Sequence, residues 1–503
     1  MSNVFDVGYL SINQLAYQFI KLSQSNVSKT NSGILIDTAT KCLQLMRKYE
    51  VIHPVADHLV HYLSKVGRSS IEFTNQWIDE TRTLNESYLL QLDHDVRQIL
   101  DQSMDTLSQE KSQELFNKIR KAVIIAIVQN KYDDGLVLLN NYITAVDFST
   151  QPKTKEQFIS NRYMEFLFYQ YVLNIFSLIW FPNDEADSNR IAIKPLSAGK
   201  FSKATVTNNS YKPLNQILSK VKNYHTKNES LFGVTDDETR YYWGILFFNL
   251  CLLFKQFKFV EFYDSFTEYF IEQQEPLNYL VHDFDALKSN LLAMFGIVSI
   301  FLKPFNSLRL IDIDTENNLI DLCSEDPASL EYKFYGQVMV PLAKCDFKNV
   351  RSVLHNEDFV ADIISQLEYN LPVSCRTNDG NTGPSFINYM MSIIDSKNFF
   401  VILTNSKEIS RLKVAELLGY DITDQNSVAQ LSNSLIGIIS ALDLQRYGVS
   451  YDSKTQNFTN EEIRDASGEI AELQENINDL QAEVRAETLA TRMTELLLEK
   501  YYN

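Results

Sequence analysis

Glycine and proline are scarce in this sequence, which has 15 Gly and 11 Pro among 503 residues. Rossmann-type enzymes and β-sandwiches use many glycine-rich turns, so the scarcity disfavours both classes. No P-loop, GxGxxG or GxSxG motif occurs either. We therefore expect neither the phosphate-binding loops nor the nucleophile elbow that those motifs mark. The prediction is an all-α chain that is not an enzyme and needs no cofactor.

Cysteine is rare as well, and its spacing is uninformative for disulfides or zinc. The number is odd, no CxxC occurs, and the residues lie far apart: Cys42, Cys251, Cys323, Cys345 and Cys375. This usage fits reduced thiols in a reducing compartment. The N-terminus also lacks the basic stretch and apolar core of a signal peptide. We expect a cytoplasmic and nuclear protein.

Basic charge is in deficit, because 64 acidic residues face 46 Lys and Arg, for a net charge of −18. An acidic surface repels phosphates, so nucleic acid and anionic membranes are unlikely partners. The longest apolar runs are Tyr163–Phe181, which contains Glu165, and Tyr241–Phe254. A bilayer crossing needs about 20 mostly apolar residues. Both runs are interpreted as buried helices of a large helical region.

One candidate for metal chemistry is a group of histidines near the N-terminus. His53, His58 and His61 lie close together, and the last two share a helix face if that segment is helical. A zinc site needs further ligands at suitable spacing, and no HExxH is present. Ordinary surface or core histidines are the favoured interpretation. No catalytic, cofactor-binding or metal site is predicted.

Most of the sequence shows apolar residues at the period of an α-helix. Three segments, near Phe116, Phe254 and Ala343, each show an apolar helix, a short polar turn with an aromatic residue, and a second amphipathic helix. The aromatic residues are Tyr132, Phe257 and Phe347. The pattern predicts a TPR-like solenoid of degenerate helical hairpins. The alternative is a set of unrelated helix pairs, as in any helical protein.

The expected organisation has five parts. Residues 1–181 form an N-terminal helical region, 182–213 a flexible loop or linker, and 214–377 a central helical-repeat region. The linker is polar and contains three prolines. Residues 384–458 form a separate module, and residues 461–502 a C-terminal coiled-coil helix.

The module has the element order of a winged helix. The expected elements are a helix at Phe386–Asn405, an extended piece at Glu408–Ser410, helices at Arg411–Leu418 and Gln425–Ser440, strands at Ala441–Gln445 and Val449–Asp452, and a closing hairpin that ends at Phe458. Winged helices often read DNA with the third helix. No Lys or Arg lies between Asp424 and Gln445, so phosphate neutralisation and guanine contacts are disfavoured there. The module is predicted to bind protein.

The tail carries three heptads. Its apolar residues alternate at three- and four-residue steps: Ile463, Ala466, Ile470, Leu473, Ile477, Leu480 and Val484. Nine acids and two bases lie between Glu461 and Glu487. Like charges would meet in a parallel homodimer, so a different partner or a helical bundle is favoured. The alternative is an amphipathic helix that folds back on its own chain.

The C-terminal third resembles the PCI family, whose members are subunits of the proteasome lid, the COP-nine signalosome and translation initiation factor three. The segments that carry the resemblance are Leu342–Leu354, Met390–Leu403, Ile409–Asp421 and Ser434–Phe458. In that family the winged helices pair edge to edge and the C-terminal helices form a bundle. The resemblance implies partner-binding residues on the wing, at Val449, Tyr451 and Phe458, and along the tail at Ile463, Ile470, Leu473, Ile477, Leu480 and Val484.

The function that the resemblance implies is that of a non-catalytic scaffold subunit. The first expectation is a signalosome or proteasome-lid subunit, which acts in ubiquitin-dependent proteolysis through cullin deneddylation or lid assembly. One alternative is a subunit of translation initiation factor three. Another is a PCI protein of messenger-RNA export, which would need a basic face on the winged helix to bind nucleic acid.

Overall fold

The structure is a computed structural model. It describes residues 5–24, 32–68, 73–101, 109–146, 162–177, 211–227, 236–273, 275–305, 308, 329–356, 359–360, 367, 369, 386–441 and 443–460. The chain is mainly helical in these ranges, as predicted, with one small sheet. All but the end of the predicted linker 182–213 lies outside them. That end is corrected, because a helix already begins at Lys212.

Most of the described residues form a helical body. Its elements up to the predicted linker are α1 (Leu10–Gln24), α2 (Ser32–Tyr49), α3 (Ala56–Lys65), α4 (Asn75–Asp101), α5 (Gln109–Val128), α6 (Tyr132–Val146) and α8 (Tyr163–Ile175). Those that follow are α10 (Lys212–Lys227), α12 (Asp236–Lys255), α13 (Phe259–Phe270), α14 (Glu275–His282), α15 (Asp285–Leu302), α17 (Leu330–Phe334), the π-helical η4 (Tyr335–Met339), α18 (Val340–Ala343) and α19 (Phe347–Leu354).

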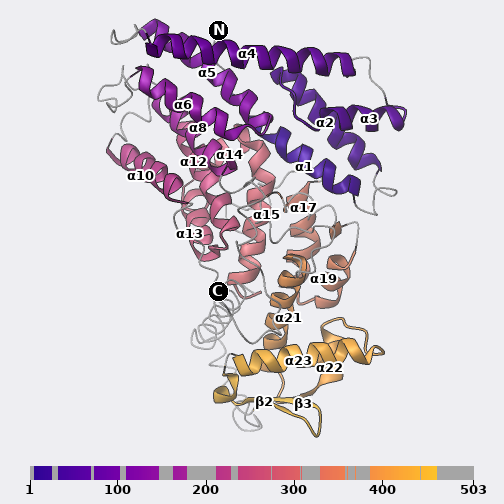
Figure 1. The fold of residues 1–503 in the computed structure, drawn as a ribbon. Helices are drawn as coiled ribbons and strands as arrows, with labels where there is room; N and C mark the ends of the chain where they lie inside the picture. The colour runs from indigo at the N-terminus through magenta and orange to yellow at the C-terminus, as the bar shows by residue number, and fades with distance from the viewer. Residues whose placement is uncertain are drawn as a thin grey trace.

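A smaller unit follows the body at the other end of the molecule from α4 (Figure 1). Its elements are α21 (Phe386–Thr404), β1 (Glu408–Ser410), α22 (Arg411–Leu417), α23 (Gln425–Ala441), the 3-10 helix η7 (Leu444–Tyr447), β2 (Val449–Asp452) and β3 (Asn457–Asn460). The first half of α21 packs in the body and the second half in the smaller unit. We call residues 399–441 and 443–460 the C-terminal unit.

The three predicted helical hairpins share one turn geometry. Each has a non-glycine residue in the left-handed region, namely Asn130 (φ 60°), Phe257 (φ 59°) and Cys345 (φ 56°). In each, the next N–H bonds back five residues, from Lys131 to Ala126, Lys258 to Leu253 and Asp346 to Pro341. This bond satisfies a carbonyl at the end of the first helix.

An aromatic residue opens the second helix two positions after each left-handed residue. These residues are Tyr132, Phe259 and Phe347, and all three are buried. The sequence therefore identified the repeated aromatic correctly in two hairpins. In the remaining one it chose Phe257, which lies in the turn itself, because the segment offers aromatic residues at both positions.

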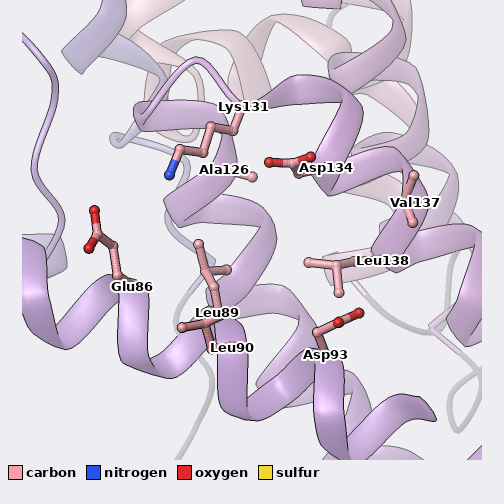
Figure 2. Close-up of a pocket in the computed structure, with 9 residues that line it drawn as sticks. All are labelled: Glu86, Leu89, Leu90, Asp93, Ala126, Lys131, Asp134, Val137 and Leu138. Carbon is pink, nitrogen blue, oxygen red and sulfur yellow. The ribbon is translucent and has the colours of Figure 1, made fainter.

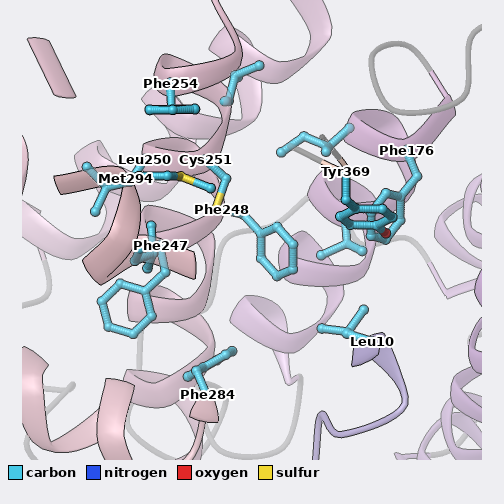
Figure 3. Packing of buried hydrophobic residues seen from close by; sticks show 14 of the residues in the cluster. Leu10, Phe176, Phe247, Phe248, Leu250, Cys251, Phe254, Phe284, Met294 and Tyr369 are labelled. Carbon is cyan, nitrogen blue, oxygen red and sulfur yellow. The ribbon is translucent and has the colours of Figure 1, made fainter. Parts of the chain in front are cut away.

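Aromatic side chains from distant segments meet in the core of the body, part of which Figure 3 shows. The ring of Phe284 lies 5.4 Å from that of Phe5 and 5.4 Å from that of Phe247. Gly244 of α12 makes this packing possible. A Cβ atom there would lie 2.5 Å from Cζ of Phe284 and 2.9 Å from Cε2 of Phe168. The N-terminus, α8 and α12 are thus held in one close-packed cluster.

The two apolar runs fold as expected, within the residues that the structure describes. The first gives α8, whose Glu165 carboxylate is buried and lies 3.2 Å from Nε of Arg120 on α5. The second forms most of α12, which packs against α8. Among the described residues, no helix combines the length and the apolar character that a membrane crossing needs.

The sheet of the C-terminal unit has the strand order β1-β3-β2, and both pairings are antiparallel. Val449–Asp452 is a strand as predicted, but Ala441–Gln445 is not. Ala441 is the last residue of α23, and a left-handed Asp443 (φ 53°) leads into η7. The strand that completes the sheet is β3, in the segment that the sequence assigned to a closing hairpin.

Candidate functional site

The C-terminal unit has an apolar core of its own, distinct from that of the body. Helices α21, α22 and α23 contribute Phe399, Ile402, Leu403, Val414, Ala415, Val428, Leu431, Leu435, Ile438 and Ile439, and Leu418, Leu444, Val449 and Phe458 complete it. The ring of Phe458 lies 4.9 Å from that of Phe399 and 4.9 Å from that of Tyr451. The sheet is therefore held on the helices through its inner face.

The three predicted wing residues lie on that inner face. Phe458 is fully buried, Val449 is 7% exposed and Tyr451 is half-buried. The expectation that the side chains of Phe458 and Val449 meet a partner is corrected, because they pack on the unit's own helices. The predicted tail residues Ile463, Ile470, Leu473, Ile477, Leu480 and Val484 lie outside the described residues.

The backbone of β2, unlike those side chains, has groups that face outward and could bond to a partner. The N–H of Asn460 bonds to the carbonyl of Lys407, and that of Arg411 bonds to the carbonyl of Gln456. In an antiparallel ladder such bonds alternate, so the amide groups of Phe458 also face β1, whereas those of Asn457 and Thr459 face β2. The same alternation turns the N–H and C=O of Val449 and Tyr451 away from the sheet.

This edge is open within the described part of the chain, where no backbone group outside the sheet bonds to Val449 or Tyr451. The outer face of the sheet is small and polar beside it. Oγ of Ser450 lies 2.7 Å from Oγ1 of Thr459, and the amide of Asn457 donates to Glu408. An exposed edge with no bulky outer side chain can accept another strand through main-chain hydrogen bonds.

Helix α23 presents a neutral face. Its exposed residues are all uncharged: Gln425, Asn426, Gln430, Asn433, Ser434, Gly437 and Ser440. The residue before the helix is acidic, since Asp424 accepts hydrogen bonds from the N–H of Asn426 and the hydroxyl of Ser427. The Ser427 hydroxyl lowers the pKa of Asp424, which keeps the carboxylate charged. Such a face can neither neutralise phosphates nor offer the usual Arg contact to guanine.

Helix α22 and the loop after it expose apolar side chains that the sequence interpretation did not select. Leu412 is 50% exposed, Leu417 is 40% exposed and Ile422 is 47% exposed. The helical period could have indicated the first two. It turns Val414, Ala415 and Leu418 inward, which leaves Leu412 and Leu417 facing out.

A polar cluster joins the unit to the body. Nη1 of Arg351 on α19 lies 3.2 Å and 3.1 Å from the two carboxylate oxygens of Asp395 on α21. The hydroxyl of Tyr420, which follows α22, donates to Asp395 at 2.7 Å, and the Arg351 guanidinium stacks 3.3 Å from the centre of that ring. Burial raises the pKa of Asp395, while the charge of Arg351 opposes the rise.

The backbone at the same joint is closely packed. Gly419 adopts a left-handed conformation (φ 78°), and a Cβ atom there would lie 3.1 Å from Cα of Lys348 on α19. The loop after α22 therefore lies directly on the body. Together with the continuous α21, this contact fixes the direction in which the open edge points.

Among the residues that the structure describes, no three His, Cys, Asp or Glu side chains come together in a group that could hold a metal ion. His53 accepts a hydrogen bond at Nδ1 from the N–H of Val55, and burial lowers its pKa to about 4. It therefore acts as a neutral turn residue before α3. No family model matches the sequence, and no curated protein matches it.

Proposed function

We propose that this chain is a non-catalytic scaffold subunit of a multi-subunit PCI complex, and that its C-terminal unit is a winged helix. The supporting observation is the order helix, strand, helix, helix, strand, strand, with β3 between β1 and β2. The repeated hairpin turn of the body supports the companion proposal of a TPR-like helical array that leads into the unit.

The open edge of β2 carries the partner contact in this proposal. A strand of a neighbouring subunit would bond to the outward amide groups of Val449 and Tyr451. Leu412 and Leu417 of α22 would supply apolar contact area. The tail at 461–502 stays a predicted second attachment, through a helical bundle.

Two kinds of PCI complex remain candidates under this proposal. A signalosome or proteasome-lid assembly, acting in ubiquitin-dependent proteolysis, is favoured, with translation initiation factor three as the alternative. A messenger-RNA export protein is disfavoured by the uncharged face of α23, because the winged helix of such a protein would need cations to hold RNA.

The experiment compares Tyr451→Pro with Tyr451→Ala in tagged full-length chains purified from cells. Both substitutions remove the ring that packs on Phe458, but only proline removes the outward N–H. We expect the alanine variant to retain the co-purifying subunits and the proline variant to lose at least one. Equal retention by both folded variants would exclude strand pairing at this edge.

A further inference from the structure

Helices α4 and α6, with Ala126 of α5 between them, line a groove of about 480 Å³ (Figure 2), at the end of the molecule opposite the C-terminal unit (Figure 1). One helix contributes Glu86, Leu89, Leu90 and Asp93, and the other contributes Asp134, Val137 and Leu138. In both helices these residues recur at three- and four-residue steps, so each set forms one continuous stripe. The groove therefore runs between two helical faces.

The apolar lining is unusually accessible. Leu90 is 74% exposed and Val137 is 55% exposed, whereas Leu138 is buried and Leu89 is half-buried. Leu90 has the largest exposed fraction of the large hydrophobic residues in the described ranges. Covering this apolar surface with a ligand would be favourable by about 25 cal/mol of free energy for each Å² removed from water.

The polar lining is acidic. Three carboxylates, of Glu86, Asp93 and Asp134, accompany one ammonium, of Lys131, so the lining has a net charge of −2. Figure 2 shows Lys131 on the side of Glu86, with Asp134 and Asp93 on the side of Val137 and Leu138. A ligand with cations beside an apolar stripe matches this distribution.

We propose that this groove binds an amphipathic helix of a partner protein. The apolar stripe of that helix seats on Leu89, Leu90 and Leu138, and Lys or Arg residues flanking the stripe face Asp134. A helix laid in a groove between two helices buries apolar residues at the same i, i+3, i+4 and i+7 steps that line the groove. This surface is separate from the C-terminal unit and does not depend on its function.

A second copy of this chain fits the groove less well. The chain has a net charge of −18, so self-association would bring acidic surfaces to an acidic groove. Nucleic acid is disfavoured for the same reason. The chemistry favours a basic helix.

The test uses the full chain and two labelled synthetic helices. Both peptides carry a leucine stripe, flanked by lysines in one and by glutamates in the other, and binding is measured by fluorescence anisotropy. We expect the lysine peptide to bind at least about tenfold more tightly, with an affinity that falls as salt rises. Equal affinities, or no binding of the lysine peptide, would overturn the proposal.

Two sets of variants locate the binding. The double variant Leu90→Lys with Val137→Lys should weaken the lysine peptide at least about tenfold. Leu84→Lys, also on α4, 67% exposed and outside the groove, is the matched control and should change nothing. Glu86→Lys with Asp134→Lys should shift the preference to the glutamate peptide.

Two outcomes would contradict the assignment. An equal loss with Leu84→Lys would mean that the peptide binds elsewhere on the surface. A concentration-dependent dimer in analytical ultracentrifugation, abolished by the double variant, would show that a second copy occupies the groove.

Discussion

The body and the C-terminal unit are both mainly helical, but their polar groups lie in different places. In the body, charged side chains are paired inside the helical packing, as where the buried carboxylate of Glu165 lies against the half-buried guanidinium of Arg120. In the C-terminal unit the core is mainly apolar, and its buried polar side chains bond to helix carbonyls: the carboxamide of Asn460 donates to Leu403, and the hydroxyl of Ser432 donates to Val428. Its unpaired backbone groups lie on the outside, at β2. The difference separates a region with a buried ion pair from a region whose outward backbone groups could make the partner contact proposed above.

The joint between them explains why the two can act together. Asp395, Arg351 and Tyr420 lock α19, α21 and the end of α22 in one arrangement. Under the proposed function, a partner bound at the edge of β2 would therefore be held in a fixed direction relative to the body, as the placing of other subunits by a scaffold requires.

The largest expected effect is on stability, and it tests whether the two apolar cores are independent. Phe458→Ala removes the central ring of the sheet and should lower the free energy of unfolding of the C-terminal unit by about 4 kcal/mol. Hydrogen exchange should rise in α22 and α23 and stay unchanged in α12 and α15. Thr459→Ala, on the outer face of the same strand, is the control and should change stability by about 1 kcal/mol or less. Equal loss of protection in the body would mean that the cores are not separate.

The next largest effect on stability is expected from a substitution in the polar cluster that joins the C-terminal unit to the body. Arg351→Ala leaves the buried carboxyl of Asp395 without its cation and should destabilise the protein by about 3 kcal/mol. Uptake of a proton by Asp395 limits the loss, since burial already raises its pKa. Chemical denaturation measures the change, with exposed Ser352→Ala on the same helix as the control. A change as small as that of the control would show that the cluster does not hold the joint.

A pH prediction concerns the body alone. Glu238 accepts a hydrogen bond from the N–H of Met164 at 2.8 Å, and burial raises its pKa from 4.5 to about 8. Between these values the folded chain keeps a proton that the unfolded chain releases, so stability is full below pH 4.5 and falls as pH rises towards 8. The slope contributed is at most about 1.4 kcal/mol per pH unit. Glu238→Gln should remove it; an unchanged pH profile would contradict this assignment.

The smallest effect on stability is expected at the surface of the C-terminal unit. Leu412→Ser with Leu417→Ser should change the free energy of unfolding by about 0.5 kcal/mol or less, because both side chains are partly exposed. The same variant should nevertheless lose co-purifying subunits. Val260→Ser, at a 43% exposed position of the body, is the matched control and should keep them. Retention of all subunits by the double variant would remove α22 from the contact surface.

Local patterns predicted the elements of the C-terminal unit more accurately than its surfaces. The extended piece Glu408–Ser410 and the helix ending before Gly419 follow from turn residues and period, and both are confirmed. The strand Ala441–Gln445 was wrong, since an apolar run at the end of α23 suits a helix as well as a strand. Which face of β2 turns inward depends on its pairing with β3, which no single strand encodes.

The joint and the groove were beyond prediction from the sequence. Arg351 and Asp395 are 44 residues apart, and Tyr420 is 25 residues beyond Asp395. No local pattern links residues on separate elements. The groove needs both α4 and α6, and each helix alone has only an ordinary mixed face. The tail heptads remain a prediction, because they lie outside the described residues.

The most direct test of the central claim is native mass spectrometry of the tagged full-length chain purified from cells. The account predicts one copy of the chain in a stable assembly with several different subunits, and it predicts loss of subunits when residues 461–503 are deleted or Tyr451 is replaced by proline. A chain that purifies alone, or as a homo-oligomer, would contradict it.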